Sequence, residues 1–335
     1  MDVDHSIGDD SIPSIGRQKT KLSMELSIII PVFNEEDNIE IIFTSVKQQM
    51  EEKINISWEL IFVDDGSKDG SWKKILGLSS LNTEIQALRF SRNFGHQYAL
   101  KAGMDRARGK AVITMDADMQ HPPALIEDLF LKWKEGFHIV NAIRMNTKGV
   151  GFGKKISSHF FYKIMNYLSD IRIEDGASDF RLVDRKVIEQ FKEMNEYFLF
   201  LRGIISWIGF KTASIEYIAD ERYSGRSKYS LKKMLHFASD GIMGFSIKPL
   251  RLATLLGFVI STFAFAYIVY AIIAKFFLHN TLSGWASLLI SILLIGGIQL
   301  LTIGIIGEYI GKIFIEIKKR PQYIISDKIE NQTDS

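Results

Sequence analysis

Two long stretches without charged side chains constrain the fold of this chain more than any other feature. They run from Leu252 to Ala274 and from Trp285 to Gly307, and a short polar segment, HNTLSG, separates them. About 20 consecutive apolar residues are enough to cross the hydrocarbon core of a bilayer. The two stretches therefore predict a transmembrane hairpin, and buried core helices are the alternative.

Basic residues flank both spans on the same side. Positive side chains stay preferentially in the cytoplasm, whereas acidic side chains count for little. Near the short connection lies only Lys275, whereas the outer flanks carry a larger set: Lys232, Lys233, Lys248, Arg251, Lys312, Lys318, Lys319 and Arg320. This asymmetry predicts that both chain ends and the large preceding domain face the cytoplasm.

A segment just before the hairpin, residues 230–248, has the pattern of an interfacial helix. Its apolar residues recur at roughly helical spacing with lysines beside them: Leu231, Met234, Leu235, Phe237 and Ala238. This pattern suits a helix that lies in the plane of the membrane interface. A plain helix packed on the soluble domain is the alternative.

Short β-branched strands alternate with helical segments from Leu26 onward. The strand-like runs include LSIIIPVF, WELIFV, IQALRF and AVITM. Continuous apolar strands separated by helices indicate a parallel sheet that is covered on both faces. Such doubly wound α/β sheets bind ligands at the carboxyl ends of their strands. Residues 1–23 are polar and predict a disordered tail.

Composition excludes several classes of protein. The formal net charge of the 335 residues is +2, which argues against a nucleic-acid binder with a wholly basic surface. The chain has no cysteine, so a disulfide framework, a thiolate zinc site and a cysteine nucleophile are excluded. Catalysis must therefore use oxygen and nitrogen groups.

Acidic residues gather where the predicted strands end, in PVFNEE, VDDGSKDG and DADMQHPP. If these strands are neighbours, one sheet edge collects the following residues: Pro31, Asn34, Glu35, Asp64, Asp65, Asp116 and Asp118. Crowded carboxylates need raised pKa values, basic partners or a bound cation, and Mg²⁺ and Mn²⁺ prefer carboxylate oxygens. The pair Asp116 and Asp118 therefore predicts a divalent-cation site, with solvated loop acids as the alternative.

Six motifs, in order, are shared with a known family. They are IIIPVFNEEDNI, FVDDGSKDGS, SRNFGHQYAL, MDADMQHPP, GASDFRLVDR and ERYSGRSKYSLKKML, and the two apolar spans follow them. The chain resembles family 2 glycosyltransferases of the polyprenyl-phosphate branch, which includes bacterial undecaprenyl-phosphate glucosyl- and aminoarabinosyl-transferases and dolichol-phosphate mannose synthase. The resemblance covers about residues 24–325. It implies a type A glycosyltransferase fold with a Rossmann-like, mostly parallel sheet, a nucleotide-sugar donor, Mg²⁺ or Mn²⁺, and a polyprenyl phosphate acceptor.

The resemblance also implies which residues bind the nucleotide-sugar. Pro31, Phe33 and Glu35 fall where the family contacts the base and the ribose. Asp65 falls on the family's nucleotide-binding aspartate. Together with Asp116, these four residues are the candidate nucleotide-sugar site.

Asp118, Asp179 and Arg144 are the candidate catalytic groups, and Asp118, Asp116 and Gln120 are the candidate metal ligands. Asp118 is expected to bind the metal directly, Asp116 to reach the ribose or the metal, and Gln120 to be a third metal ligand. Asp179 matches the family position proposed for the general base. A phosphate monoester is already anionic near neutral pH, with a second pKa of about 6. The alternatives for Asp179 are therefore orientation of the acceptor or capping of local structure.

Basic residues are expected to bind the phosphates. Arg144 follows the strand-like run FHIVNAI, where a guanidinium would grip a phosphate with two parallel hydrogen bonds; a surface ion pair is the alternative. The residues assigned to the acceptor or the leaving diphosphate are Arg222, Arg226, Lys228 and Lys154. Basic side chains beside a membrane also attract anionic lipid without further function.

The sequence thus predicts inverting transfer of a sugar to undecaprenyl phosphate at the cytoplasmic face of the bacterial inner (plasma) membrane, for modification of a cell-envelope glycan. UDP-glucose is the preferred donor by resemblance, and GDP-mannose, UDP-4-deoxy-4-formamidoarabinose and UDP-GlcNAc are alternatives. A processive polysaccharide synthase is disfavoured, because RGIISW at 202–207 lacks a Gln-x-x-Arg-Trp pattern. A noncatalytic membrane scaffold is the alternative of another class.

The expected parts of the chain follow from these patterns. They are a tail (1–23), a cytoplasmic catalytic domain (24–229), amphipathic interface helices (230–248), a transmembrane hairpin (249–315, with spans at about 252–274 and 285–307) and a cytoplasmic C-terminal tail (316–335). Single hairpins often gain stability by packing against copies of themselves, so a homo-oligomer is expected.

Overall fold

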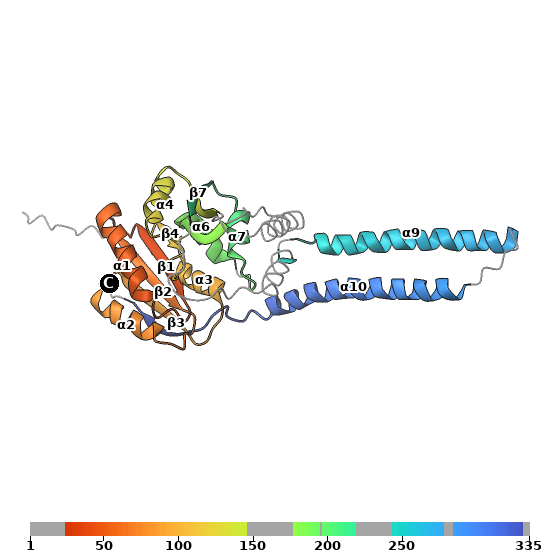
Figure 1. The fold of residues 1–335 in the computed structure, drawn as a ribbon, viewed down its shortest axis with the longest axis horizontal. Coiled ribbons are helices and arrows are strands. Elements are labelled where there is room, and N and C mark those ends of the chain that lie inside the picture. The colour runs from red at the N-terminus through yellow and green to blue at the C-terminus, as the bar shows by residue number, and fades with distance from the viewer. Residues whose placement is uncertain are drawn as a thin grey trace, which may run out of the picture.

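The computed structural model describes residues 24–145, 177–194, 196–218, 243–244, 246–277 and 284–330. Four candidate phosphate-binding residues, Lys154, Arg222, Arg226 and Lys228, lie outside these ranges, as do the N-terminal tail and most of the expected interface helix. The described residues form an α/β domain from which two long helices project side by side (Figure 1).

A mixed eight-stranded sheet forms the centre of the domain (Figure 1), and its strand order is β7-β5-β6-β4-β1-β2-β3-β8. The strands are β1 (Leu26–Val32), β2 (Trp58–Asp64), β3 (Ile85–Phe90), β4 (Ala111–Thr114), β5 (Ile139–Met145), β6 (Ala177–Asp184), β7 (Thr212–Ile218) and β8 (Ile325–Ile329). Only β6 and β8 run antiparallel to their neighbours. The expected mostly parallel α/β sheet is therefore confirmed.

Helices cover both faces of the sheet. On one face lie α1 (Ile39–Gln49), α2 (Ser71–Leu81) and α4 (Leu125–Lys134), and on the other α3 (His96–Arg106), α6 (Arg185–Glu193) and α7 (Leu201–Trp207). A short π-helical turn, Met50–Ile54, extends α1.

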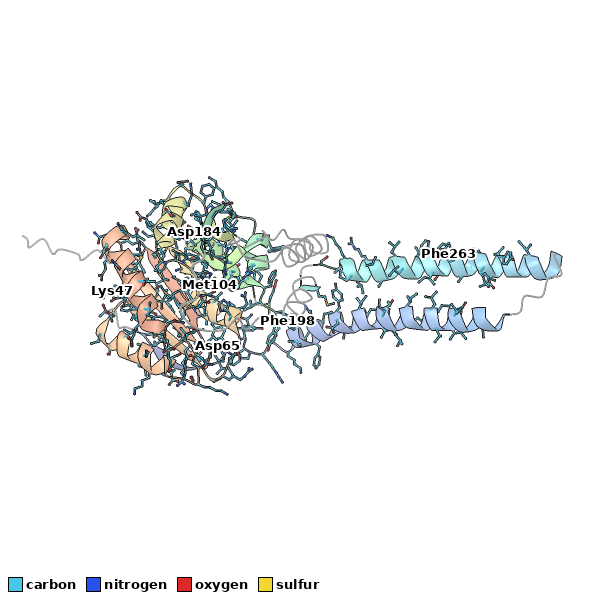
Figure 2. All side chains as sticks on the ribbon, viewed as in Figure 1. Lys47, Asp65, Met104, Asp184, Phe198 and Phe263 are labelled. Carbon is cyan, nitrogen blue, oxygen red and sulfur yellow. The ribbon has the colours of Figure 1, made fainter. Side chains whose placement is uncertain are left out.

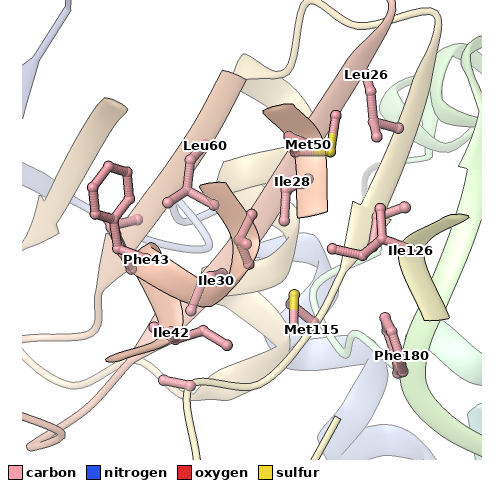
Figure 3. Close-up of a cluster of buried hydrophobic side chains, with 14 of the residues drawn as sticks. Leu26, Ile28, Ile30, Ile42, Phe43, Met50, Leu60, Met115, Ile126 and Phe180 are labelled. Atoms are coloured by element: carbon pink, nitrogen blue, oxygen red, sulfur yellow. The ribbon is translucent and has the colours of Figure 1, made fainter. Parts of the chain in front are cut away.

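The side chains of successive residues in β1 point to opposite faces of the sheet, as the two-residue repeat of a strand requires. Ile28 and Ile30 pack into the cluster beneath α1, where Figure 3 shows Ile28 beside Met50 and Ile30 beside Ile42. Ile29 packs into the cluster beneath α3. Because both faces are covered, the strand reads as an unbroken apolar run, and each fully buried side chain contributes about 1.5–3 kcal/mol.

Gly103 brings α3 close to the sheet. A Cβ atom at this position would overlap the side chain of Ile29 on β1. The absence of a side chain therefore sets the distance between α3 and the central strand. This matters for the site, because the first residue of α3 is His96.

The two projecting helices, α9 (Lys248–Phe277) and α10 (Trp285–Ile317), contain the predicted spans. They pass the length and hydropathy criteria for membrane spans over Lys248–Tyr270 and Ile290–Ile317, and only 6% and 0% of these windows are buried. Their large apolar side chains, Phe263 among them, stand out from the helices (Figure 2). Such long exposed apolar surfaces mark a membrane-associated protein, and the core-helix alternative is excluded.

The segment after α10 returns to the domain and adds β8 to the outer edge of β3. Tyr323 stacks on Phe90, with ring centroids 5.1 Å apart, and its hydroxyl donates to Oδ2 of Asp105 at 2.8 Å. Part of the expected C-terminal tail is therefore a strand of the sheet. The sequence ISDKI was missed because it is short and carries two charged residues, a common feature of edge strands.

Candidate active site

Hydrogen bonds connect the segments that follow the carboxyl ends of β1 and β2. Asn34 has a left-handed backbone (φ 55°), its N–H donates to Oγ of Ser67 at 2.9 Å, and its Oδ1 accepts from the Lys68 N–H at 2.9 Å. The Glu35 N–H donates to Oγ of Ser71 at 3.0 Å. The two strand ends therefore form one fixed surface at the carboxyl edge of the sheet.

Three candidate nucleotide residues lie at this exit of β1. Pro31 is buried and in register with Val63 of β2, and Phe33 and Glu35 are half-buried. Nδ2 of Asn38 donates to Oε2 of Glu35 at 2.7 Å. The structure brings the three residues together, and their contact with a nucleotide stays a prediction.

Asp65 holds the loop that leads into α3. Its two carboxylate oxygens accept the backbone N–H groups of Phe94 and Gly95 at 2.7 and 2.9 Å. Gly95 has a φ of 116°, which a side chain would disfavour. Burial raises the pKa of Asp65, although the two backbone hydrogen bonds lower it. Asp65 therefore positions the start of α3, and its expected role in nucleotide binding remains a prediction.

The DxD pair lies on a tight turn directly after β4. The N–H of Gln120 donates to Oδ1 of Asp118 at 3.1 Å, and Met119 between them has a left-handed backbone (φ 62°). The Asp116 N–H donates to Nδ1 of His121 at 2.9 Å. Oδ1 of Asp116 is buried and accepts no hydrogen bond within the described part of the chain. The turn thus presents both carboxylates, and Oδ1 of Asp116 lies 3.4 Å from Nε2 of His96 without a hydrogen bond.

Asp179, near the start of β6, is held by side chains from two helices. Arg202 of α7 donates from Nε to Oδ1 at 2.9 Å and from Nη2 to Oδ2 at 3.0 Å. Nε2 of Gln97 on α3 donates to Oδ2 at 3.3 Å. Burial raises the pKa of Asp179, but Arg202 and then His96 outweigh it and hold the pKa well below 3.8. Asp179 is therefore a stable carboxylate.

His96, the first residue of α3, bridges the two acidic centres. Its Nε2 lies 3.4 Å from Oδ1 of Asp116 and 3.6 Å from Oδ2 of Asp179. Burial lowers the pKa of His96, but the two carboxylates raise it to about 9. The side chain is still 41% exposed, so water screens part of this attraction. Asp116 and Asp179 therefore face a common space.

Arg144 ends β5 on the same side of the sheet. It is exposed and in register with Tyr217 of β7. Burial raises the pKa of the Tyr217 hydroxyl, the charge of Arg144 lowers it, and the carboxylates of Asp116 and Asp118 raise it further. Tyr217 therefore lies within the electrostatic influence of both Arg144 and the DxD turn, and the binding of a phosphate by Arg144 stays a prediction.

Several residues of this site were not expected from the sequence. They are His96, Gln97, His121 and Arg202. His96 and Gln97 lie in the motif SRNFGHQYAL directly after a strand, so their position at the active edge was a usable signal. Arg202 had no such signal, because it reaches Asp179 only through the packing of α7 against the sheet.

Comparison with known proteins defines the class. Residues 27–191 match the description Glycosyl transferase family 2, and residues 248–313 match the GtrB C-terminal hairpin. The chain therefore belongs to glycosyl transferase family 2 and is a glycosyltransferase. This confirms the family that the six sequence motifs indicated.

The relatives make the assignment more specific. The chain is 44% identical over 311 residues to the uncharacterized glycosyltransferase YkcC of Bacillus subtilis (strain 168), which covers 92% of this chain and 96% of that protein. It is 42% identical over 302 residues to the prophage bactoprenol glucosyl transferase homolog of Escherichia coli (strain K12), with coverage of 90% and 98%. The bactoprenol glucosyl transferase of Shigella phage SfII is 41% identical over 302 residues, with coverage of 90% and 97%.

Proposed function

We propose that the protein transfers glucose from UDP-glucose to polyprenyl phosphate at the cytoplasmic face of the bacterial plasma membrane, with inversion at the anomeric carbon. The names of relatives that are 41% and 42% identical over 90% of the chain support the sugar and the acceptor. The structural observation that carries the proposal is the meeting of Asp116 and Asp179 around His96, at 3.4 and 3.6 Å. In this proposal the DxD turn binds the donor and Asp179 lies on the side of the acceptor.

The DxD turn fits a divalent cation, Mg²⁺ or Mn²⁺. A buried carboxylate oxygen normally has a hydrogen-bond partner, whereas Oδ1 of Asp116 lies 3.4 Å from Nε2 of His96 and accepts no hydrogen bond from the described residues. Within those residues no three acidic or histidine side chains could hold a metal alone, which suits an ion completed by substrate phosphates. Asp116, Asp118 and Gln120 would hold it. A bound cation would offset negative charge on the leaving diphosphate.

The phosphate of the lipid acceptor does not need a strong general base to act as a nucleophile. An oxygen of the lipid phosphate forms the new bond to the anomeric carbon while the bond to the diphosphate breaks and UDP leaves. With a second pKa of about 6, the phosphate is largely a dianion at neutral pH. Asp179 has a lowered pKa and is a poor proton acceptor. We therefore assign Asp179 the orientation of the acceptor, with the charge of Arg202 reducing its repulsion of the phosphate.

Further cations would bind the phosphates. Arg144 at the end of β5 is the described candidate, since its fork of donors matches a phosphate. The candidates Lys154, Arg222, Arg226 and Lys228 lie outside the described residues and stay part of the proposal.

The C-terminal end of α10 contacts the loop that leads into α7. These contacts would keep the candidate site near the membrane. The Tyr197 N–H donates to both carboxylate oxygens of Glu316 at 3.1 Å, and Nζ of Lys312 lies 5.2 Å from the ring centre of Phe198. Figure 2 shows Phe198 between the domain and α10. The same loop continues into α7, which carries Arg202. The head group of a membrane-bound acceptor would then lie close to Asp179.

A panel of radiolabelled donors tests the proposal. Purified protein in detergent with undecaprenyl phosphate and Mn²⁺ or Mg²⁺ would receive UDP-glucose, GDP-mannose, UDP-4-deoxy-4-formamidoarabinose or UDP-GlcNAc. We expect label to enter the lipid fraction from UDP-glucose and only weakly from the others. Preferential transfer from another donor would refute the assigned sugar, and no transfer from any donor would favour a noncatalytic scaffold.

A further inference from the structure

The ring of His121 is fixed against the first aspartate of the DxD turn. Its Nδ1 accepts the N–H of Asp116 at 2.9 Å, and its Nε2 lies 3.7 Å from Oδ2 of the same residue. His121 is only 5% exposed. One ring therefore faces both the backbone and the carboxylate of Asp116.

Aromatic neighbours fix the orientation of this ring. Phe180 stacks on it, with ring centroids 5.0 Å apart and planes at 17°, and Tyr217 meets it edge-on at 6.3 Å and 76°. Phe180 is the neighbour of Asp179 on β6. His121 therefore joins the turn that presents Asp116 to the strand that presents Asp179.

The sequence after His121 favours this arrangement. Pro122 restricts the backbone of the residue before it to extended conformations, and the two prolines have fixed φ angles that suit the entry to a helix. The N–H of Leu125, the first residue of α4, donates to the Pro122 carbonyl at 3.1 Å. The main chain thus leaves toward α4 while the His121 side chain contacts Asp116.

We propose that His121 is a positioning residue for the DxD turn, which holds Asp116 in the orientation that a cation and the donor require. This inference rests on the proposed function for the identity of the donor. A histidine that only fills space in the core would need the aromatic contacts but neither nitrogen contact. The imidazole nitrogens, and Nδ1 above all, are therefore the groups to test.

Two matched substitutions separate packing from positioning. His121→Phe keeps an aromatic ring for Phe180 and removes both nitrogens. His121→Asn offers an amide oxygen near the place of Nδ1, so it can accept the Asp116 N–H. His138→Phe is the control, because His138 lies at the opposite end of β5 with its ring 5.2 Å from that of Phe210.

The readout is binding rather than turnover. Free Mn²⁺ is titrated with the full-length protein and UDP by electron paramagnetic resonance, and melting temperatures are recorded in parallel. Loss of a residue that orients a metal ligand typically weakens metal binding about 10- to 100-fold, and we expect this for His121→Phe. His121→Asn should recover most of the affinity, and His138→Phe should bind as the wild type does.

The opposite results would overturn the inference. They are wild-type affinity in His121→Phe, equal weakness of the Phe and Asn variants, or no Mn²⁺ binding by the wild type in the presence of UDP. If His121→Phe does not fold, His121→Gln replaces it, because the Gln amide reaches the place of Nε2 but offers no acceptor at the place of Nδ1. In that case the inference requires that the His121→Asn variant bind Mn²⁺ more tightly than the His121→Gln variant. A wild type that binds Mn²⁺ with UDP but transfers no glucose would refute the proposed function alone.

Discussion

Arg202 on α7 grips the carboxylate of Asp179 on β6 with two hydrogen bonds, at 2.9 and 3.0 Å. Two parallel bonds fix the plane of the carboxylate as well as its place. The pair is mostly shielded from water, with side-chain exposures of 23% and 10%. Asp179 is therefore a pre-oriented, charge-balanced group, and its proposed role is to orient the acceptor.

Replacing Arg202 tests this relationship. Arg202→Gln leaves Asp179 without its main partner, which should destabilise the fold by about 1–3 kcal/mol and lower kcat by roughly 100-fold through misplacement. Arg202→Lys keeps the charge but not the fork, so it should retain most of the stability and only part of kcat. Unfolding in detergent and steady-state kinetics provide the two measurements.

A surface ion pair serves as the control for Arg202. Arg106 on α3 pairs with Glu330 at 2.7 Å, and both side chains are over 40% exposed. Exposed pairs contribute about 0–1 kcal/mol, so Arg106→Gln should leave kcat unchanged. Equal losses of kcat in Arg202→Gln and Arg106→Gln would show that removal of a positive charge, rather than loss of the hydrogen bonds to Asp179, lowers activity.

The lowered pKa of Asp179 makes stability depend on pH. A carboxyl group whose pKa is lower in the folded state stabilises the fold above its unfolded value, about 3.9, and loses this contribution as the pH falls through the folded value. We expect Asp179→Asn to melt below the wild type at neutral pH, and the gap to shrink below about pH 4. A gap that stays constant down to about pH 3 would contradict the lowered pKa.

The rate of transfer should fall at acidic pH because of the acceptor phosphate and not because of the protonation of Asp179. Since its pKa lies well below 3.8, Asp179 stays ionised across the range in which the acceptor phosphate titrates, with a pKa of about 6. The pH–rate profile of Asp179→Asn should therefore fall below about pH 6 as that of the wild type does, at a lower rate throughout. Disappearance of this fall in the variant would instead identify Asp179 as the base.

Gly103 should be intolerant of even a methyl group. Gly103→Ala forces the new Cβ against Ile29, and overpacking of a core typically costs about 1–3 kcal/mol; it would also shift α3, and with it His96. Gly77→Ala is the matched control, since nothing lies within 4 Å of its Cβ and Ala is favoured in a helix by about 0.5–1 kcal/mol. Thermal unfolding of the two variants should shift in opposite directions, and equal destabilisation would contradict the close packing.

The DxD turn could be found from sequence because its signal is local. Asp116 and Asp118 directly follow an apolar strand, and parallel strands collect their carboxyl ends at one edge. The same reasoning gave Arg144 at the end of β5. In each case the element and the site residue are neighbours in the chain, so one pattern predicts both.

The supports of the site depend on contacts between distant segments. Arg202 meets Asp179 across 23 residues and Gln97 meets it across 82, and no spacing rule predicts such pairs. The contact of His121 with Asp116 depends on the shape of the turn between them, which no spacing rule predicts either. The strand β8 was missed for a related reason, since only its pairing with β3 makes Ile325–Ile329 a strand.

We infer that this sheet edge transfers glucose to polyprenyl phosphate, and substitution of one DxD residue is the sharpest test of that inference. Asp118→Asn removes a carboxylate from the turn, whereas Asp128→Asn makes the same change on the exposed surface of α4. Full-length variants with matched melting temperatures would receive UDP-glucose, undecaprenyl phosphate and Mn²⁺, and mass spectrometry would quantify the lipid-linked glucose. We expect loss of the product by at least about 100-fold in Asp118→Asn and wild-type yield in Asp128→Asn. Undiminished product in Asp118→Asn would contradict this inference.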